Sequence, residues 1–510
     1  MSLIQIKGPT IVSDQGSRSF PIVDIGKLTN GGYALSWMGV TPTSLGGGSD
    51  VFTVVYGADG QPIPGSSILD VTQSPGSNDY DLQITPLASG RYAVTWLAQL
   101  PGAAFEVYTT VYGADGQPIP GIGTSNVTNN GPFLWDHNPR VTALAGGGYA
   151  LTWYGDAPAT GVNGYDIVTA VYTDDGQPVG GTSVVNVSNT TTLRETDVQI
   201  AALTNGGYAM VWTAAPIAGG TPEVFTAVYG ADGQPVPDSV IISASGLSGG
   251  GGSAPEITAL ADGGYALAWY NNTAVYTAVF SADGQPKPGT GAVNVSGGGG
   301  LYPQLAALDG GGFAIVWLGN GVGGNDVFTA VYGPDGQLLA GTTPLNVSNS
   351  PGLGEQRPQI AALTNGGYAL SWAASGGGSD IYTAAFGADG QPVGTNNVLR
   401  VNETSGFQDL DPRITALADG AYALTWYGLP TSPNPSDPTA PVYTAVFQVV
   451  TDNVAPTINS DGGGASAIVS LAENTSAVST VSATDPDAGQ TLTYAIASGA
   501  DAEKFTINAT

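Results

Sequence analysis

The chain of 510 residues has 40 acidic and 11 basic side chains, a formal net charge of −29 at pH 7, and no cysteine. The excess of negative charge excludes nucleic-acid backbones and anionic membrane surfaces as expected partners. Disulfides and thiolate chemistry are excluded as well. Hydrophobic residues make up 42% of the chain, which is too much apolar surface for a disordered protein.

The N-terminal residues 1–10 lack the basic region and the long apolar stretch of a cleavable export signal. No run of about 18 apolar residues occurs in the chain, so we expect no membrane-spanning segment. Residues 10–13 (TIVS) have strand character and resemble the Asn-Val-Ser segments of later repeats, such as residues 346–348.

One sequence pattern then recurs eight times. Its clearest copy reads NGGYALSW at residues 365–372, DIYTA at 380–384 and ADGQP at 388–392. Successive copies are 48 to 59 residues apart, a repeat length found in propellers and helical arrays. Each copy has a tryptophan at the same position, and we expect these side chains to pack between repeats: Trp37, Trp96, Trp153, Trp212, Trp269, Trp317, Trp372 and Trp426.

The pattern inside each repeat decides between these two architectures. Every copy but the last contains four short stretches of strand character, as residues 358–363, 368–372, 381–386 and 397–401 illustrate, and none has apolar spacing of three and four. The Asn-Gly-Gly and Asp-Gly segments between them are typical of tight hairpins. Four antiparallel strands joined by hairpins form one propeller blade. We therefore predict an all-β fold, an eight-bladed β-propeller of four-stranded antiparallel blades.

The last repeat lacks a fourth strand, because it continues directly into residues 451–453. We predict that an N-terminal strand at residues 9–13 completes blade 8 and closes the ring. The predicted propeller covers residues 1–448, followed by a linker at 449–458 and a partial β-sandwich at 459–510. The predicted blades lie near residues 19–73, 74–129, 130–188, 189–245, 246–296, 297–348, 349–402 and 403–448.

Loops of variable length gather on one predicted face, and such loops on a rigid scaffold often bind ligands. An acid opens the third strand of six repeats: Asp50, Glu106, Asp166, Glu223, Asp326 and Asp380. A polar residue precedes the apolar position of all eight first strands: Asp24, Gln83, Arg140, Gln199, Glu256, Gln304, Gln359 and Arg413. If the first strand is innermost, the second set surrounds the channel mouth. Both sets are candidates for a cation or glycan site, and we predict that the second set binds a neutral glycan or a surface polymer. The alternative is that both sets only solvate the strand ends.

Few residues in the chain suit catalysis or zinc binding. The single histidine, His137, has no nucleophile motif around it, and a chain without cysteine and with one histidine lacks zinc ligands. A catalytic pair of carboxylates of the glycosidase type is still an alternative, since acids of distant loops can meet around the channel. Because the acids recur from blade to blade, we predict that the chain is not an enzyme.

The segment after residue 456 resembles the bacterial cadherin-like domain. The resemblance rests on LAENT at residues 471–475, ATDPDAG at 483–489, LTY at 492–494 and FTI at 505–507, and it covers about half of such a domain. It implies a calcium site with Asp485 and Asp487 as ligands, together with Asp452 and Asn453 of the linker. Glu473 matches a further acidic ligand of that family. Oxygen ligands of this kind suit Ca²⁺.

The GGYALxW and ADGQP motifs of the repeats resemble those of large RTX-type, calcium-associated bacterial surface proteins. That resemblance implies a bacterial protein that is secreted or held at the cell surface after type I export. We predict an adhesion or glycan-binding module whose partner is a glycan or a cell-surface polymer, and which is monomeric as a fragment. The alternatives are a polysaccharide hydrolase or lyase with its site at the channel mouth, and a structural spacer.

Overall fold

The computed structural model describes most of the chain in two compact units. One unit is Leu3–Val449 and the other combines Met1–Ser2 with Val450–Thr510, and each is described by itself. The described residues are 1–17, 22–39, 49–72, 78–99, 104–128, 135–156, 164–181, 184–237, 239–321, 323–350, 352–375, 379–394, 397–402, 407–430, 439–450, 456–460, 468–473, 475–484, 494–496 and 501–507.

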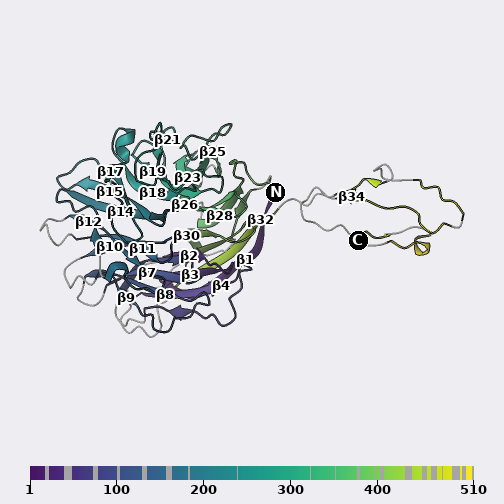
Figure 1. Cartoon of the computed structure of the whole chain (residues 1–510), viewed down its shortest axis with the longest axis horizontal. Coiled ribbons are helices and arrows are strands. Elements are labelled where there is room, and N and C mark those ends of the chain that lie inside the picture. Colours follow the sequence, from purple (N-terminus) through teal and green to yellow (C-terminus); the bar gives the residue numbers. More distant parts are fainter. Residues whose placement is uncertain are drawn as a thin grey trace. The chain divides into compact units, whose positions relative to one another are not determined.

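The larger unit is an eight-bladed β-propeller of four-stranded antiparallel blades, as predicted (Figure 1). The strands of blades 1 to 4 are β2 (Val23–Lys27), β3 (Tyr33–Gly39), β4 (Asp50–Tyr56), β5 (Leu69–Asp70); β6 (Asn78–Pro86), β7 (Tyr92–Gln99), β8 (Phe105–Tyr112), β9 (Ser125–Asn126); β10 (Asp136–Ala143), β11 (Tyr149–Asp156), β12 (Tyr165–Tyr172), β13 (Val185–Asn186); and β14 (Leu193–Ala202), β15 (Tyr208–Pro216), β16 (Glu223–Tyr229), β17 (Ile242–Ser243).

The strands of blades 5 to 8 are β18 (Ser253–Ala259), β19 (Tyr265–Tyr270), β20 (Val275–Phe280), β21 (Val293–Asn294); β22 (Leu301–Ala307), β23 (Phe313–Asn320), β24 (Asn325–Tyr332), β25 (Leu345–Asn346); β26 (Gly354–Ala362), β27 (Tyr368–Ser375), β28 (Ser379–Phe386), β29 (Val398–Arg400); and β30 (Phe407–Ala416), β31 (Ala421–Pro430), β32 (Thr439–Val450) with β1 (Ser2–Ser17). Two short 3-10 helices, η1 (Val179–Gly181) and η2 (Ser245–Ser248), lie in the connections.

The first strands of the blades are innermost and form a closed circle. In the order β2, β6, β10, β14, β18, β22, β26 and β30, each contacts the next, and β30 contacts β2. A central channel therefore runs between these eight strands, and the residues at their starts surround one of its mouths.

The N-terminal strand closes the ring. β1 lies beside β32 as the fourth strand of blade 8, and Gly16 also pairs with Gly39 of β3 in blade 1. β1 is longer than the predicted strand at residues 9–13, since it spans Ser2–Ser17 and reaches from β32 of blade 8 to β3 of blade 1. Blades 8 and 1 consequently share one continuous sheet of eight strands.

The core is built from aromatic side chains that repeat in every blade. The eight recurring tryptophans expose at most 2% of their surface, so they pack between blades as expected. Most of them stack on an aromatic ring of the neighbouring strand in their own blade, as Trp37 does on Phe52 with ring centroids 5.7 Å apart. Trp153 instead lies opposite Val168. Burying a side chain of this size contributes roughly 4 to 6 kcal/mol, so each tryptophan is a large contribution to the stability of the propeller.

A belt of hydroxyl contacts joins neighbouring blades. A buried threonine on the third strand of one blade contacts the hydroxyl of a buried tyrosine on the second strand of the next blade, at 2.9 to 3.3 Å. This contact occurs at seven of the eight blade boundaries. At the boundary between blades 5 and 6, Thr277 has no such partner because the equivalent residue is Phe313.

The smaller unit has little regular structure in its described residues. It contains the paired two-residue strands β33 (Thr457–Ile458) and β34 (Ala483–Thr484) and the 3-10 helix η4 (Ala502–Lys504). Apolar side chains in this unit are exposed, among them Ile468 at 99% and Phe505 at 49%. The predicted β-sandwich at residues 459–510 is therefore not confirmed, and the linker at 449–458 stays a prediction too.

Candidate functional site

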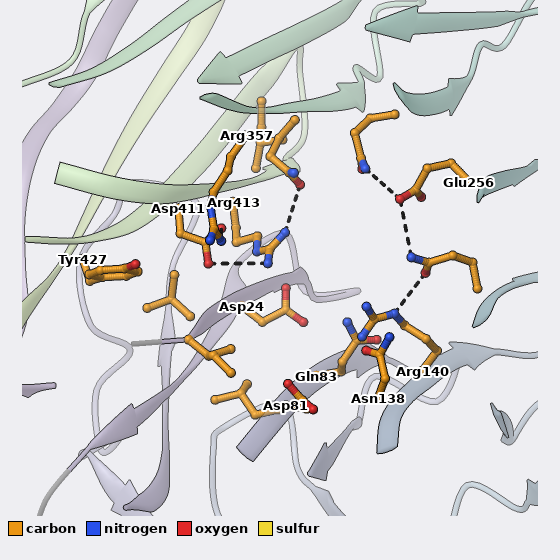
Figure 2. A pocket seen from close by; sticks show the side chains of 17 residues that line it. Asp24, Asp81, Gln83, Asn138, Arg140, Glu256, Arg357, Asp411, Arg413 and Tyr427 are labelled. Atoms are coloured by element: carbon orange, nitrogen blue, oxygen red, sulfur yellow. Dashed lines mark hydrogen bonds and ion pairs between the residues drawn. The ribbon is translucent and has the colours of Figure 1, made fainter. Parts of the chain in front are cut away.

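A cavity of about 620 Å³ lies at the channel mouth, where the innermost strands begin (Figure 2). All eight predicted ring residues line this cavity: Asp24, Gln83, Arg140, Gln199, Glu256, Gln304, Gln359 and Arg413. One residue comes from each blade, because equivalent positions of the eight repeats face the same axis. The structure thus places the predicted set together, while its role in ligand binding stays a prediction.

Seven innermost strands share a backbone irregularity that the sequence analysis missed. The pairing register shifts two residues before the ring position, so each of these strands carries a β-bulge. The bulged residue has φ between +46° and +54° in each strand: Asp81, Asn138, Asp197, Ala254, Tyr302, Arg357 and Asp411. Left-handed backbone at non-glycine residues is strained, and such bulges often re-aim side chains beside functional sites.

The bulges supply a second set of polar groups to the cavity. Asp81, Asn138, Arg357 and Asp411 line it together with the ring residues (Figure 2). A sequence signal for these positions exists, because proline follows the bulged residue in five of the seven strands. Proline inside a strand sequence marks an edge strand or a bulge, since it cannot donate a ladder hydrogen bond.

Hydrogen bonds connect the ring residues of blades 3 to 6 (Figure 2). Arg140 Nε donates to Gln199 Oε1 at 3.0 Å, and Gln199 Nε2 donates to Glu256 Oε1 at 3.4 Å. Gln304 Nε2 donates to the same Glu256 oxygen at 2.7 Å. Glu256 is therefore held between two amide donors from the blades on either side of its own.

A second network links blades 7 and 8. Arg357 Nη1 donates to Asp411 Oδ1 at 2.9 Å, and Arg413 Nη2 lies 3.6 Å from Asp411 Oδ2. Arg413 Nη1 also donates to Gln359 Oε1 at 3.3 Å. Asp411 thus neutralises part of the positive charge of these two arginines.

The two carboxyls of the ring differ in their surroundings. Loss of water in the cavity wall raises the pKa of Glu256 to about 7, and Arg140, Gln304 and Arg413 oppose that shift. Burial also raises the pKa of Asp24, although its oxygens accept the backbone N–H groups of Ile25 at 3.0 Å and Ile84 at 2.9 Å. Asp24 and Glu256 belong to blades 1 and 5, which are opposite one another in an eight-bladed ring.

Three of the 11 basic residues of this acidic chain line the channel-mouth cavity: Arg140, Arg357 and Arg413. Among the described residues, Arg140 has no carboxylate within ion-pair distance, and its guanidinium donates instead to Gln199 and to the carbonyl of Pro139. An arginine presents several donors in a planar fork that matches carboxylate groups and polar ligands. The cavity therefore combines acidic, cationic and neutral amide groups.

The single histidine lies outside this cavity. His137 stacks on Tyr154, with ring centroids 5.2 Å apart, and contacts the edge of Tyr165 at 5.1 Å. Burial lowers the pKa of His137. His137 is therefore packed among aromatic side chains.

The predicted calcium ligands of the C-terminal segment lie mostly outside the described residues. Asp452, Asn453, Asp485 and Asp487 lie outside the described residues, and Glu473 is exposed. Within the described ranges, no group of three or more acidic, histidine or cysteine side chains is positioned to hold a metal ion. Calcium binding by these five residues stays a prediction.

The chain was compared with known proteins. No protein-family model and no curated protein matches it. The resemblance to RTX-type surface proteins and to the cadherin-like domain is therefore not supported by these comparisons. Among the described residues, no helix has the length and apolar character needed to cross a bilayer.

Solved structures resemble the propeller. Polysaccharide lyase Uly1 is 9% identical with a TM-score of 0.43, and the alignment covers 88% of this chain and 100% of that one. An α-L-arabinanase of Penicillium chrysogenum is 14% identical with a TM-score of 0.35, covering 66% and 99%. A prolyl endopeptidase is 12% identical with a TM-score of 0.44, covering 84% and 56%. At such identities the likeness concerns the fold alone.

The prediction that the chain is not an enzyme is contradicted. The similar solved structures include α-L-arabinofuranosidases, an arabinanase, a sialidase and a polysaccharide lyase. The prediction rested on the recurrence of acids from blade to blade. The ring is in fact chemically asymmetric, because Glu256 with its raised pKa occupies one position only and the arginines occupy others.

Proposed function

We propose that the protein cleaves a polysaccharide, as a hydrolase or a lyase, in the cavity at the channel mouth. The observation that supports this most is Glu256, a carboxyl held by two glutamines in the cavity wall with its pKa raised to about 7. A group whose pKa lies near the working pH can both give and take a proton, which is the requirement for general acid–base catalysis.

The cavity suits either of the two cleavage chemistries. In hydrolysis, a protonated carboxyl donates to the leaving oxygen while a second carboxyl acts from the other side of the sugar, and Asp24 is the ring carboxyl on the opposite blade. In elimination, a deprotonated Glu256 takes the proton from the carbon next to a uronate carboxylate, the glycosidic bond on the adjacent carbon breaks as a carbon–carbon double bond forms, and the leaving oxygen takes a proton from water. Arg140 would bind the uronate carboxylate. The pH dependence of turnover distinguishes the two.

Neutral groups of the same cavity would orient the sugar rings. The amides of Gln83, Gln304 and Asn138 carry both donors and acceptors, which match sugar hydroxyls. A polymer as substrate agrees with the predicted glycan partner and with the predicted secreted or cell-surface location, both of which stay proposals.

The test is an assay of the full chain against a panel of neutral and uronate-containing polysaccharides. Reducing-end release without a new carbon–carbon double bond identifies a hydrolase, and release with the ultraviolet absorbance of that double bond identifies a lyase. The Glu256→Gln variant should lose the activity, whereas Asp389→Asn on a distant exposed turn should retain it. Binding of a polymer without product release would contradict the proposal. Absence of both binding and product release would favour a structural spacer.

A further inference from the structure

Five innermost strands carry a buried acid four residues before the ring position. These acids expose 0 to 2% of their surface: Asp79, Asp136, Glu195, Glu355 and Asp409. The proposed catalysis does not use them, and none of them lines the channel-mouth cavity, although Glu355 lines an adjoining cavity that shares Arg357 and Arg413 with it. Each lies within the first three residues of an innermost strand, at the boundary with the preceding blade.

Three of these acids lie beside another acid of the preceding blade, one of those that open a third strand. The charge of Asp50 helps to raise the pKa of Asp79, that of Asp166 raises the pKa of Glu195, and that of Asp326 raises the pKa of Glu355. Two carboxyls from different blades therefore share each of the boundaries 1/2, 3/4 and 6/7.

At two other boundaries the protein itself provides donors for the buried acid. Trp153 Nε1 donates to Asp136 Oδ1 at 3.0 Å, and Trp426 Nε1 donates to Asp409 Oδ1 at 3.0 Å. The Asn402 amide also donates to Asp409. These boundaries show how a buried carboxylate is satisfied when nothing is taken from solution.

The acids at boundaries 1/2, 3/4 and 6/7 have no comparable indole or amide donor, and only hydroxyl side chains lie beside them: Thr72 beside Asp79, Thr190 beside Glu195, and Ser348 and Ser350 beside Glu355. Both oxygens of Asp79, both oxygens of Glu355 and Oε2 of Glu195 are buried without a hydrogen-bond partner in the described part of the chain. Buried carboxylate oxygens are rarely left unsatisfied in folded proteins, so these atoms point to an ion or a proton that occupies the site.

Neutral oxygen atoms of threonine and serine side chains lie beside the paired acids at these blade boundaries. At boundary 3/4, Thr190 joins both acids, since its backbone N–H donates to Asp166 Oδ1 at 3.2 Å and its hydroxyl donates to Glu195 Oε1 at 2.8 Å. At boundary 6/7, the side chains of Ser348 and Ser350 lie beside Glu355. Carboxylate and hydroxyl oxygens are the ligands that Ca²⁺ prefers. The acids of the preceding blade also accept amide hydrogen bonds, from Asn186 to Asp166 and from Asn346 to Asp326, each at 2.6 Å.

We propose that boundaries 1/2, 3/4 and 6/7 of the propeller each bind one divalent cation of the calcium class between the paired carboxylates of adjacent blades. A divalent cation neutralises both carboxylates of a pair and removes their repulsion, whereas a proton neutralises only one. The net charge of −29 also favours cations over anions throughout the molecule. This inference does not depend on the proposed catalytic activity.

The experiment compares three versions of the full chain after chelation with EDTA. The inter-blade variant is Asp79→Asn, Glu195→Gln and Glu355→Gln together. The charge-matched control is Asp59→Asn, Asp232→Asn and Asp335→Asn, at exposed turns where the replacement amide can still accept the same backbone N–H bond. Calcium chloride is added above pH 7, and bound ions and the thermal unfolding midpoint are measured.

We expect the wild type and the control to bind calcium with a rise in the unfolding midpoint, and the inter-blade variant to bind three ions fewer with little rise. If the triple variant does not fold, the single variant Glu355→Gln replaces it in the experiment. That variant should bind one calcium ion fewer than the wild type. A further variant with Asp452, Asp485 and Asp487 replaced by Asn separates calcium bound by the C-terminal segment. Equal calcium binding by the wild type and the inter-blade variant, or none by the wild type, would overturn the proposal and leave protonation as the explanation.

Discussion

The hydroxyl of Tyr33 in blade 1 lies 3.3 Å from the hydroxyl of Thr444 in blade 8, although 411 residues separate them in the sequence. This contact repeats the threonine–tyrosine contact found between blades elsewhere in the ring. It therefore joins the last blade to the first with the same side-chain chemistry that joins successive blades. Closure of the propeller consequently depends on both β1 and this contact.

Phe313→Tyr should stabilise the propeller by about 0.5 to 1.5 kcal/mol, because it would supply the one missing hydroxyl of the belt opposite Thr277. Urea unfolding of the full chain measures the change. In a Thr277→Val background the same substitution should give no gain, since no partner hydroxyl remains. Destabilisation in both backgrounds would mean that the site near Phe313 has no room for the oxygen.

Deletion of residues 2–13 should destabilise the propeller strongly. It removes most of β1, leaves the outer edge of β32 unpaired, and exposes apolar side chains that Leu3 and Val12 now help to bury. The measurement is the thermal unfolding midpoint. Deletion of residues 456–510 is the control and should leave the midpoint of the propeller unchanged, because those residues belong to the other compact unit. An equal midpoint for the N-terminal deletion would contradict closure by β1.

Glu256→Gln should lower polysaccharide turnover by roughly 10²- to 10⁴-fold, the usual contribution of a general acid or base. The wild type should show a transition in its pH–rate profile near pH 7, where the carboxyl titrates. If the protonated form acts as the acid of a hydrolase, turnover falls above that pH. If the carboxylate acts as the base of a lyase, turnover falls below it. A profile that the substitution leaves unchanged would exclude Glu256 from proton transfer.

The stability of the chain in EDTA should fall as the pH rises from about 4 to about 7. The pKa values of Asp79, Glu195 and Glu355 are raised to about 7, mainly by burial and also by Asp50, Asp70, Asp166 and Asp326. In that interval the folded state holds protons that the unfolded state has released, so the free energy of unfolding decreases and then levels off. The inter-blade variant should show a smaller decrease in urea titrations across this range. A wild-type stability that rises over the same interval would show that these carboxyls are ionised when folded.

The blade count, the four-stranded blades and the ring position were all predictable from the sequence. Repetition makes these features visible, because eight equivalent tryptophans and eight equivalent ring residues require equivalent places in eight similar sheets. Asp24 and Glu256 could be assigned to the same cavity for that reason, without any knowledge of distances.

The asymmetry of the site was not predictable in this way. The raised pKa of Glu256 depends on desolvation and on donors from neighbouring blades, so no single repeat encodes it. The bulges that turn Asp81, Asn138, Arg357 and Asp411 toward the cavity are backbone distortions, which the proline positions indicate only indirectly.

The sequence by itself determined the repeat, and with it the propeller and the set of residues around the channel, because local strand patterns and hairpin turns recur at regular spacing. The tertiary structure alone decided which charges meet across blade boundaries and which of them have partners. Those properties depend on burial and on contacts between residues of different blades, such as the hydrogen bonds by which Thr190 joins Asp166 to Glu195, and short-range sequence patterns carry no record of such contacts.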